Sequence, residues 1–153
     1  MSKKRVVQKE DASGKKIPKS TENALSYLNK KPSWRFSRCD MGHDKWSVFQ
    51  NGMLRDDIFE KLKSYEGMTW AEIQSASGGK AEGNGNNNHF EDVSSFSKEA
   101  RDRCEKIKLY EDQLFSLRLG GRPRLYGVID DGAFEIIWYD KEHEIYESHK
   151  RNT

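Results

Sequence analysis

The sequence predicts an α+β fold, with a small antiparallel sheet packed against two or three helices. Apolar residues recur at helical spacing in residues 53–65 and 97–111. After Asp112 they recur at every second position, which is typical of β-strands. A short alternating stretch at residues 34–37 adds one N-terminal strand. Because the helical segments lie between strands near the two ends of the chain, we expect the helices to pack on one face of the sheet.

The composition indicates one cytoplasmic domain with a modest core. The chain has 153 residues, of which 34% are apolar and 34% charged, while four Trp, six Tyr and seven Phe add to the core. Cys39 and Cys104 fit no CxxC pattern, so we interpret them as reduced thiols. No apolar run approaches the length of a membrane span and no signal-peptide core stands at the N-terminus, so no membrane association is expected.

Charge is distributed unevenly along the chain. Residues 1–31 hold nine Lys and Arg against three Asp and Glu, whereas the remaining residues hold 18 against 22. We therefore predict a flexible basic arm over residues 1–31, in which a short helix can follow Ser20. A single domain over residues 32–148 and a tail over residues 149–153 complete the chain. The arm can bind nucleic acid or an acidic partner, and a solvated terminus without a partner is the alternative.

Three helices are expected in the middle of the chain. The first covers residues 53–65, and its apolar face consists of Leu54, Ile58, Leu62 and Tyr65. A short second helix follows, because Thr69 and Glu72 have the spacing of a capping box. The Gly- and Asn-rich segment 77–88 predicts a mobile loop. The third helix begins after the N-cap Ser97, and its apolar positions are Ala100, Cys104 and Ile107.

The C-terminal strands are predicted to form a meander with a packed face and an open face. Gly120 and Gly121 turn the chain between the first two strands, and the stretch 130–132 is a hairpin signal before the third. The packed face consists of alternating apolar residues, Phe115, Leu117, Leu119, Leu125 and Ile129. In the third strand we expect one face to carry Phe134, Ile136 and Trp138 and the other to carry Ile137 and Tyr139.

The open face carries side chains that a purely structural sheet does not need. Arg118 and Arg124 point away from the packed face, and Arg122 lies at the turn. Together with Tyr126 and Tyr139 they can bind a phosphate backbone, since arginine binds phosphate through two hydrogen bonds and an aromatic ring stacks on a base. Residue types alone favour the simpler alternative, a solvated face with cross-strand ion pairs.

Three residues with proton-transfer chemistry follow the last strand, Glu142, His143 and Tyr146. His143 or Glu142 can take a proton from a 2′-hydroxyl while an arginine stabilises the charge that develops on the phosphate. The acidic residues around His143 are expected to raise its pKa and keep it protonated, as a general acid requires.

Other kinds of site are not indicated. The segments GGKAEGNG and GGRPR lack the spacing of a phosphate-binding loop. Cys39 and His43 are four residues apart, but no second ligand pair stands at zinc-site spacing, so neither a metal nor a cofactor is expected. The sequence does not exclude a nucleophilic pair of Cys39 with a histidine. Cys104 lies on an apolar helix face and is interpreted as a core residue.

Residues 114–146, LFSLRLGGRPRLYGVIDDGAFEIIWYDKEHEIY, resemble the C-terminal sheet of the RelE/ParE toxin-like superfamily. The shared pattern is a leucine-alternating strand, a glycine turn, Arg124 with Tyr126, an acidic-glycine hairpin, an apolar strand, and then His143 with Tyr146. The preceding strand and helices also fit the family's order. The resemblance therefore covers residues 34–148 and indicates a bacterial or mobile-element branch of that superfamily.

The resemblance implies a metal-independent mRNA endoribonuclease, acting on free or ribosome-bound RNA, or a gyrase poison, held in either case by an antitoxin protein. The catalytic residues would be Arg124, His143 and Tyr146. The RNA contacts would come from Arg118, Arg122, Tyr126 and Tyr139. The alternative is a non-catalytic protein of a phage or mobile element that keeps this fold and binds a protein partner or nucleic acid.

Overall fold

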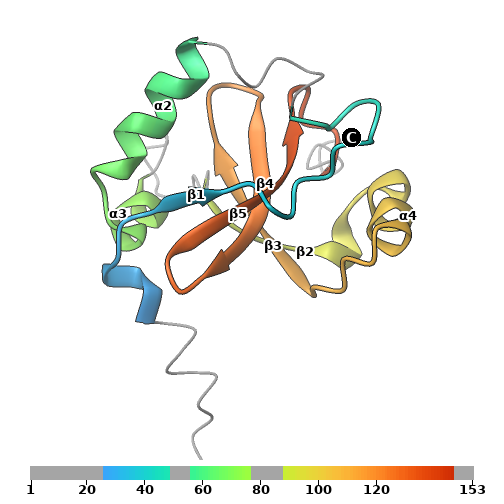
Figure 1. Cartoon of the computed structure of the whole chain (residues 1–153), viewed down its shortest axis with the longest axis horizontal. Helices are drawn as coiled ribbons and strands as arrows, with labels where there is room; N and C mark the ends of the chain where they lie inside the picture. The colour runs from blue at the N-terminus through green and yellow to red at the C-terminus, as the bar shows by residue number, and fades with distance from the viewer. Residues whose placement is uncertain (1–25, 49–55, 77–87, 147–153) are drawn as a thin grey trace, which may run out of the picture.

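The computed structural model describes residues 26–48, 56–76 and 88–146. Three expected segments lie wholly or mostly outside these residues. They are the tail 149–153, the arm 1–31 except for residues 26–31, and the loop 77–88 except for Asn88. The described residues form an α+β fold, in which a five-stranded sheet carries helices on both faces (Figure 1). None of the helices within these ranges has the length and apolar character needed to cross a membrane.

Ten elements lie within the described residues. In chain order they are η1 (Tyr27–Asn29), β1 (Ser33–Arg35), α2 (Asp56–Glu66), α3 (Trp70–Ser75), β2 (His89–Asp92), η2 (Val93–Ser95), α4 (Lys98–Lys106), β3 (Gln113–Arg118), β4 (Arg124–Asp130) and β5 (Ala133–Asp140). Their order confirms the predicted succession of strand, helices and C-terminal meander.

The sheet differs in two ways from the antiparallel sheet that the sequence predicts. Its strand order is β1-β5-β4-β3-β2, and β1 runs parallel to β5, so the sheet is mixed. A parallel pair needs a long connection, and α2, α3 and α4 lie between these two strands in the chain. The second difference is β2, a four-residue edge strand antiparallel to β3, which the sequence analysis does not predict.

The helix starts follow the capping signals in the sequence. The capping box is confirmed, since the Thr69 hydroxyl accepts the Glu72 N–H at 3.2 Å and the Glu72 carboxylate accepts the Thr69 N–H at 2.9 Å. The N-cap Ser97 is confirmed as well, because its hydroxyl accepts the N–H of Ala100 at 3.2 Å. The short helix expected after Ser20 lies mostly outside the described residues, which begin with the helical Ser26 followed by the 3-10 turn η1.

Helices cover both faces of the sheet, which corrects the expectation of helices on one face only. On the first face, α2, α3 and η1 pack against the expected apolar row of the strands, in a core that includes Ile58, Leu62, Trp70, Phe115 and Leu117. On the second face, α4 packs Ala100 and Cys104 against the other side of the strands, in a core that also includes Trp46, Leu114, Tyr126 and Trp138. The strands are buried on both faces because each of their two rows contains enough apolar residues to build a core.

A β-bulge in β5 changes which residues face which core. Tyr126 pairs with Trp138 whereas Gly127 pairs with Ile136, so Ile137 is the extra residue of the bulge and has no partner position on β4. After the bulge Trp138 lies in the core of the second face and Tyr139 in the core of the first. The faces expected for Phe134, Ile136 and Ile137 are therefore confirmed, and those expected for Trp138 and Tyr139 are wrong.

The bulge brings the β5 backbone close to Gly127, which yields a stability prediction. A Cβ atom at Gly127 would lie 2.2 Å from the Glu135 carbonyl oxygen, whereas one at Gly121 would meet nothing within 4 Å. Gly127→Ala should therefore cost about 2–3 kcal/mol of unfolding free energy, because backbone must move to admit the methyl group. Gly121→Ala, the matched control, should change it by less than about 1 kcal/mol. Urea denaturation of both variants measures the difference, and equal stabilities would contradict the close approach.

Candidate functional site

Charged residues lie side by side where the central strands end. Arg118 on β3 stands opposite Arg124 on β4, and Arg124 stands opposite Asp140 on β5. All three belong to the row of residues that faces the α4 side of the sheet. Arg124 lies two positions before Tyr126 and Asp140 two positions after Trp138, and Arg118 is the partner of Arg124. We call the group formed by Arg118, Arg124, Asp140 and the adjacent His143 the polar end of the second face.

The two arginines hold the turn between β3 and β4. The Nη1 atom of Arg124 lies 3.1–3.4 Å from four backbone carbonyl oxygens, those of Gly120, Gly121, Arg122 and Pro123. The Nε atom of Arg118 donates to the Gly120 carbonyl at 2.5 Å. Burial and the neighbouring charge of Arg118 both lower the pKa of Arg124 from its usual value. The pair is thus a half-buried, concentrated positive charge that an anion would relieve.

Arg122 lies on the surface of the same turn. Its guanidinium group forms an ion pair with the Glu142 carboxylate at 2.9 Å, and both side chains are more than half exposed, at 69% and 52%. An exposed pair of this kind contributes less than about 1 kcal/mol. Arg122 can therefore exchange Glu142 for a phosphate at small cost.

Asp140 shapes the turn that carries His143. Its carboxylate is fully buried and accepts the backbone N–H groups of Glu144 at 2.9 Å and Ile145 at 2.8 Å. His143 directly precedes these two residues and has a φ of 62°, a conformation that histidine tolerates better than most residues. Burial raises the pKa of Asp140, and hydrogen bonds from the backbone of Glu144, Ile145 and His143 oppose that rise.

The protonation of His143 differs from the expectation. Burial is the largest influence and lowers the pKa of His143, and the positive charge of Arg124 lowers it further. The acidic neighbours in sequence were expected to raise it, but Glu142 is paired with Arg122 and Glu144 lies near Lys45, so neither dominates the imidazole. The neutral form is therefore favoured at pH 7, which suits a proton acceptor.

The tyrosines of the expected site lie in three different places. Tyr126 is 1% exposed beneath Phe96, at a ring-centroid distance of 5.5 Å, and burial raises its pKa far above the usual value. Tyr139 is 3% exposed and lies in the core of the opposite face. Neither ring is open for a base to stack on, which corrects the expected open face. Tyr146 is half-buried against the core of the second face, beyond the turn of His143.

Two residues that the sequence analysis does not single out lie on the same face. His89 on β2 stands opposite Ser116, which stands opposite Tyr126. The His89 Nε2 atom lies 2.6 Å from a carboxylate oxygen of Glu91, which is 8% exposed, and the Nδ1 atom of His89 is buried without a partner among the described residues. The alternation of His89 and Glu91 with Phe90 is the signal that could have identified this strand.

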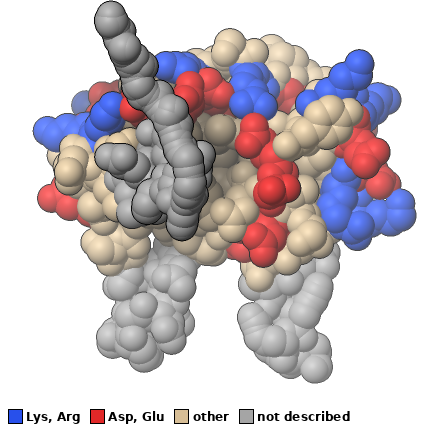
Figure 2. All heavy atoms as spheres, turned by 90° about the horizontal axis from the view of Figure 1, so that it is seen from below, with Lys and Arg blue, Asp and Glu red and all other residues tan. Residues whose placement is uncertain are grey.

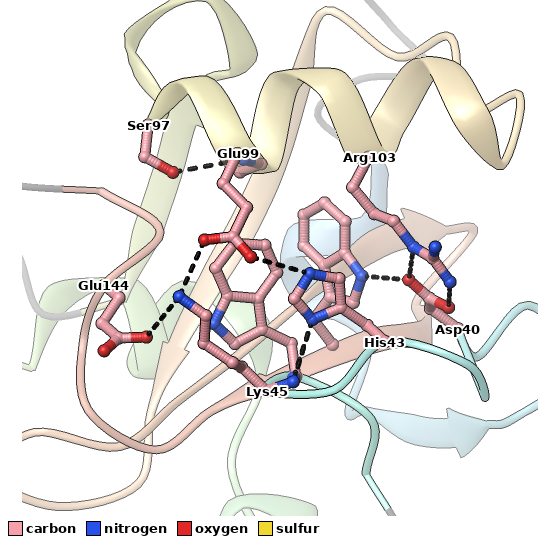
Figure 3. Close-up of polar contacts among 10 residues, drawn as sticks. Asp40, His43, Lys45, Ser97, Glu99, Arg103 and Glu144 are labelled. Atoms are coloured by element: carbon pink, nitrogen blue, oxygen red, sulfur yellow. Dashed lines mark hydrogen bonds and ion pairs between the residues drawn. The ribbon is translucent and has the colours of Figure 1, made fainter.

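A chain of ion pairs connects the His143 turn to α4 (Figure 3). Lys45, in the loop after β1, lies 2.7 Å from Glu99 on α4 and 3.8 Å from Glu144 in the His143 turn. His43 stacks on Trp46 at 4.2 Å, and its Nε2 atom lies 3.3 Å from Glu99. The loop after β1 thus joins α4 to the turn that carries the candidate acid–base residue.

Asp40 anchors that loop beneath α4. Its carboxylate, 2% exposed, accepts two hydrogen bonds from Arg103 at 2.6 and 2.7 Å and one from the Trp138 indole at 2.8 Å (Figure 3). Burial alone would raise the pKa of Asp40, but the hydrogen bonds from Arg103, Trp138 and the Gly42 N–H outweigh it and hold the pKa below its usual value. One carboxylate therefore links the loop, α4 and β5.

The cysteines and metal-ligand residues supply no second site. Burial raises the pKa of both Cys39 and Cys104 to about 11, so at neutral pH both thiols are protonated and weak nucleophiles. Within the described ranges no group of three His, Cys, Asp or Glu side chains is placed to hold a metal ion.

Comparisons of the chain with protein families, with curated proteins and with solved structures gave no match. The interpretation of the site therefore rests on its own residues and geometry.

The buried Asp40 carboxylate yields a prediction for stability and its pH dependence. Asp40→Asn removes the charge that Arg103 faces and should cost about 3 kcal/mol of unfolding free energy, whereas Asp131→Asn, which breaks an exposed pair with Lys30, should cost less than about 1 kcal/mol. Because the folded pKa is lowered, this stabilisation should be complete above the unfolded pKa of about 3.9 and disappear as pH falls through the folded value.

Chemical denaturation between pH 3 and pH 7 measures both effects. The Asp40→Asn variant should lose the part of the acid sensitivity that the wild-type protein shows below pH 4. Equal losses in Asp40→Asn and Asp131→Asn would contradict the role of this carboxylate.

Proposed function

We propose that the polar end of the second face binds the phosphate backbone of RNA, and that the protein cleaves RNA there without a metal ion. The observation that carries the proposal is a half-buried arginine pair, Arg118 and Arg124, beside His143, whose pKa is lowered by burial first and further by the charge of Arg124. A phosphate would relieve the repulsion between the arginines, and Arg122 at the rim could guide it in.

The chemistry follows from the protonation of His143. As the neutral imidazole it accepts the proton of a ribose 2′-hydroxyl, whose oxygen then attacks the adjacent phosphorus. The 2′-oxygen–phosphorus bond forms and the bond to the 5′-oxygen breaks, while Arg124 stabilises the extra negative charge on the phosphate. The leaving 5′-oxygen takes up a proton, for which His89, held by Glu91, is the candidate donor on the same face.

The toxin-like resemblance of the sequence, which includes Arg124 and His143, also supports this proposal. We therefore propose a toxin-like endoribonuclease that an antitoxin protein restrains by covering the polar end. Tyr146, packed beside the His143 turn, would support the position of that turn. RNA would be bound through the arginines, because Tyr126 and Tyr139 are buried.

A second function is favoured by the contacts of Arg124. Its Nη1 atom is surrounded by the four carbonyl oxygens of its own turn, as in a structural arginine. If Arg124 keeps these contacts, the protein is a non-catalytic binder of RNA or of a protein, and only the exposed Arg122 meets the ligand.

Variants at the polar end distinguish these functions. His143→Ala should lower the cleavage rate of a single-stranded RNA in EDTA by about 100-fold or more while leaving affinity nearly unchanged, because it removes the proton acceptor. Arg122→Ala should weaken binding by about fivefold, since one exposed phosphate contact is lost. Lys63→Ala, an exposed residue on α2 against the other face, is the control and should change neither.

The measurements are a gel assay of end-labelled RNA fragments and a binding titration at fixed salt. Wild-type protein that binds RNA without cutting it would favour the non-catalytic function. Wild-type protein that neither binds nor cuts RNA would exclude both RNA functions.

The pH dependence of cleavage tests the assigned role of His143. Because its pKa is lowered from 6.5 and the neutral form is the base, kcat/KM should rise with pH through a value below 6.5 and be level at neutral pH. A rate that falls as pH rises through this range would assign His143 the role of a general acid instead. The profile of His89→Ala, measured in parallel, separates the two histidines.

A further inference from the structure

A groove lies between α4 and the start of β3, on the side of the molecule away from the polar end. Its volume is about 640 Å³, and its floor is formed by Val93, Cys104 and Leu109. Tyr110 stands beside this floor with 76% of its surface exposed, the largest exposure among the large apolar residues of the described chain. An apolar floor with an exposed aromatic ring is a surface that a partner segment can cover.

The rim of the groove is strongly acidic. Five carboxylates line it, those of Asp92, Asp102, Glu105, Glu111 and Asp112, and Arg101 is the one cation among the lining residues. Acidic side chains also form a row across the lower face of the molecule, seen from below in Figure 2. A ligand for this groove must therefore be basic, and a nucleic acid would be repelled.

Most of this negative charge is not neutralised by the described chain. Asp102 is paired with Lys98 at 2.8 Å and Glu111 with Arg38 at 3.6 Å. Within the described residues no cation pairs with the other three carboxylates, those of Asp92, Glu105 and Asp112, although Asp92 accepts a hydrogen bond from the neutral Gln113 amide. The groove thus presents three uncompensated charges around an apolar floor.

We propose that the groove is occupied by the basic N-terminal arm of the same chain. Residues 1–25 carry seven Lys and Arg against three Asp and Glu. In the segments KKRVVQK and KKIPK, lysines and an arginine flank the apolar residues Val6, Val7 and Ile17. This pattern is the complement of an apolar floor with an acidic rim.

The length of the arm permits this docking. A segment of 25 residues can extend to about 80 Å, more than twice the diameter of about 30 Å of a small domain. The arm is joined to the fold at Ser26, so it can reach the groove from any side. Tethering also raises its effective concentration at the groove above that of a separate basic peptide.

Paramagnetic NMR of the full-length chain tests the proposal. Ser13→Cys places one reactive thiol in the arm, and a nitroxide can be attached there selectively because the half-buried Cys39 and the buried Cys104 have pKa values of about 11. At low salt, the backbone amide signals of residues 105–112 should be lost, and those of α2 on the other side of the sheet should be retained.

Charge reversal supplies matched variants. Asp112→Lys should restore part of the lost signal and the addition of Glu105→Lys should restore more, because each removes an attraction and adds a repulsion. Glu60→Lys on α2, an exposed carboxylate with the same change in charge, should leave the loss unchanged. High salt should act like the groove variants, since it screens exposed charges.

The results distinguish docking of the chain's own arm from docking of the arm of a second copy. Retention of the 105–112 signals in the labelled wild-type chain, or their equal loss in Asp112→Lys and Glu60→Lys, overturns the proposal. Mixing spin-labelled chains with isotope-labelled chains reports on contacts between molecules. Signal loss that occurs only in that mixture would assign the groove to the arm of a second copy and would overturn docking within one chain.

Discussion

The hydrogen bonds to the buried Asp40 carboxylate hold the second layer of this protein together. Asp40 lies in the loop after β1, and its carboxylate accepts hydrogen bonds from Arg103 on α4 and from Trp138 on β5. A buried carboxylate costs free energy unless its oxygens are satisfied, so the three elements are constrained to meet in one arrangement. The closed second face follows from this constraint, and so does the burial of Tyr126 beneath it.

That closure decides how much of the sheet is available to a ligand. α4 and the loop after β1 cover the middle of the second face, and Arg118, Arg124 and His143 are left at its end. The ion pairs of Lys45 with Glu99 and Glu144 connect the cover to the turn that bears His143. Packing of α4 and the position of the candidate base are therefore parts of one assembly, while the acidic groove lies at the other end of the sheet.

The local features of the fold could be predicted because each depends on neighbours in sequence. The capping box of Thr69 and Glu72 satisfies backbone groups within one helical turn, and the meander follows from alternation and turn residues. Of the candidate site, the pairing of Arg118 with Arg124 could be predicted from the same alternation, and His143 from its position just after the last strand. The alternation of His89 and Glu91 with Phe90 indicates a strand, but its place beside β3 could not be predicted, because β2 is four residues long and its partner strand is more than twenty residues away.

The amino-acid sequence therefore determined the succession of helices and strands, the apolar row of the first face and the two arginines of the polar end, since all are set by short-range spacing. Tertiary contacts decided the rest. Tyr126 is buried beneath α4 rather than exposed. The bulge at Ile137 places Tyr139 in the core of the opposite face. Burial lowers the pKa of His143, although its neighbours in sequence are acidic. Burial and charge depend on which groups meet in space, and residue spacing along the chain does not contain that information.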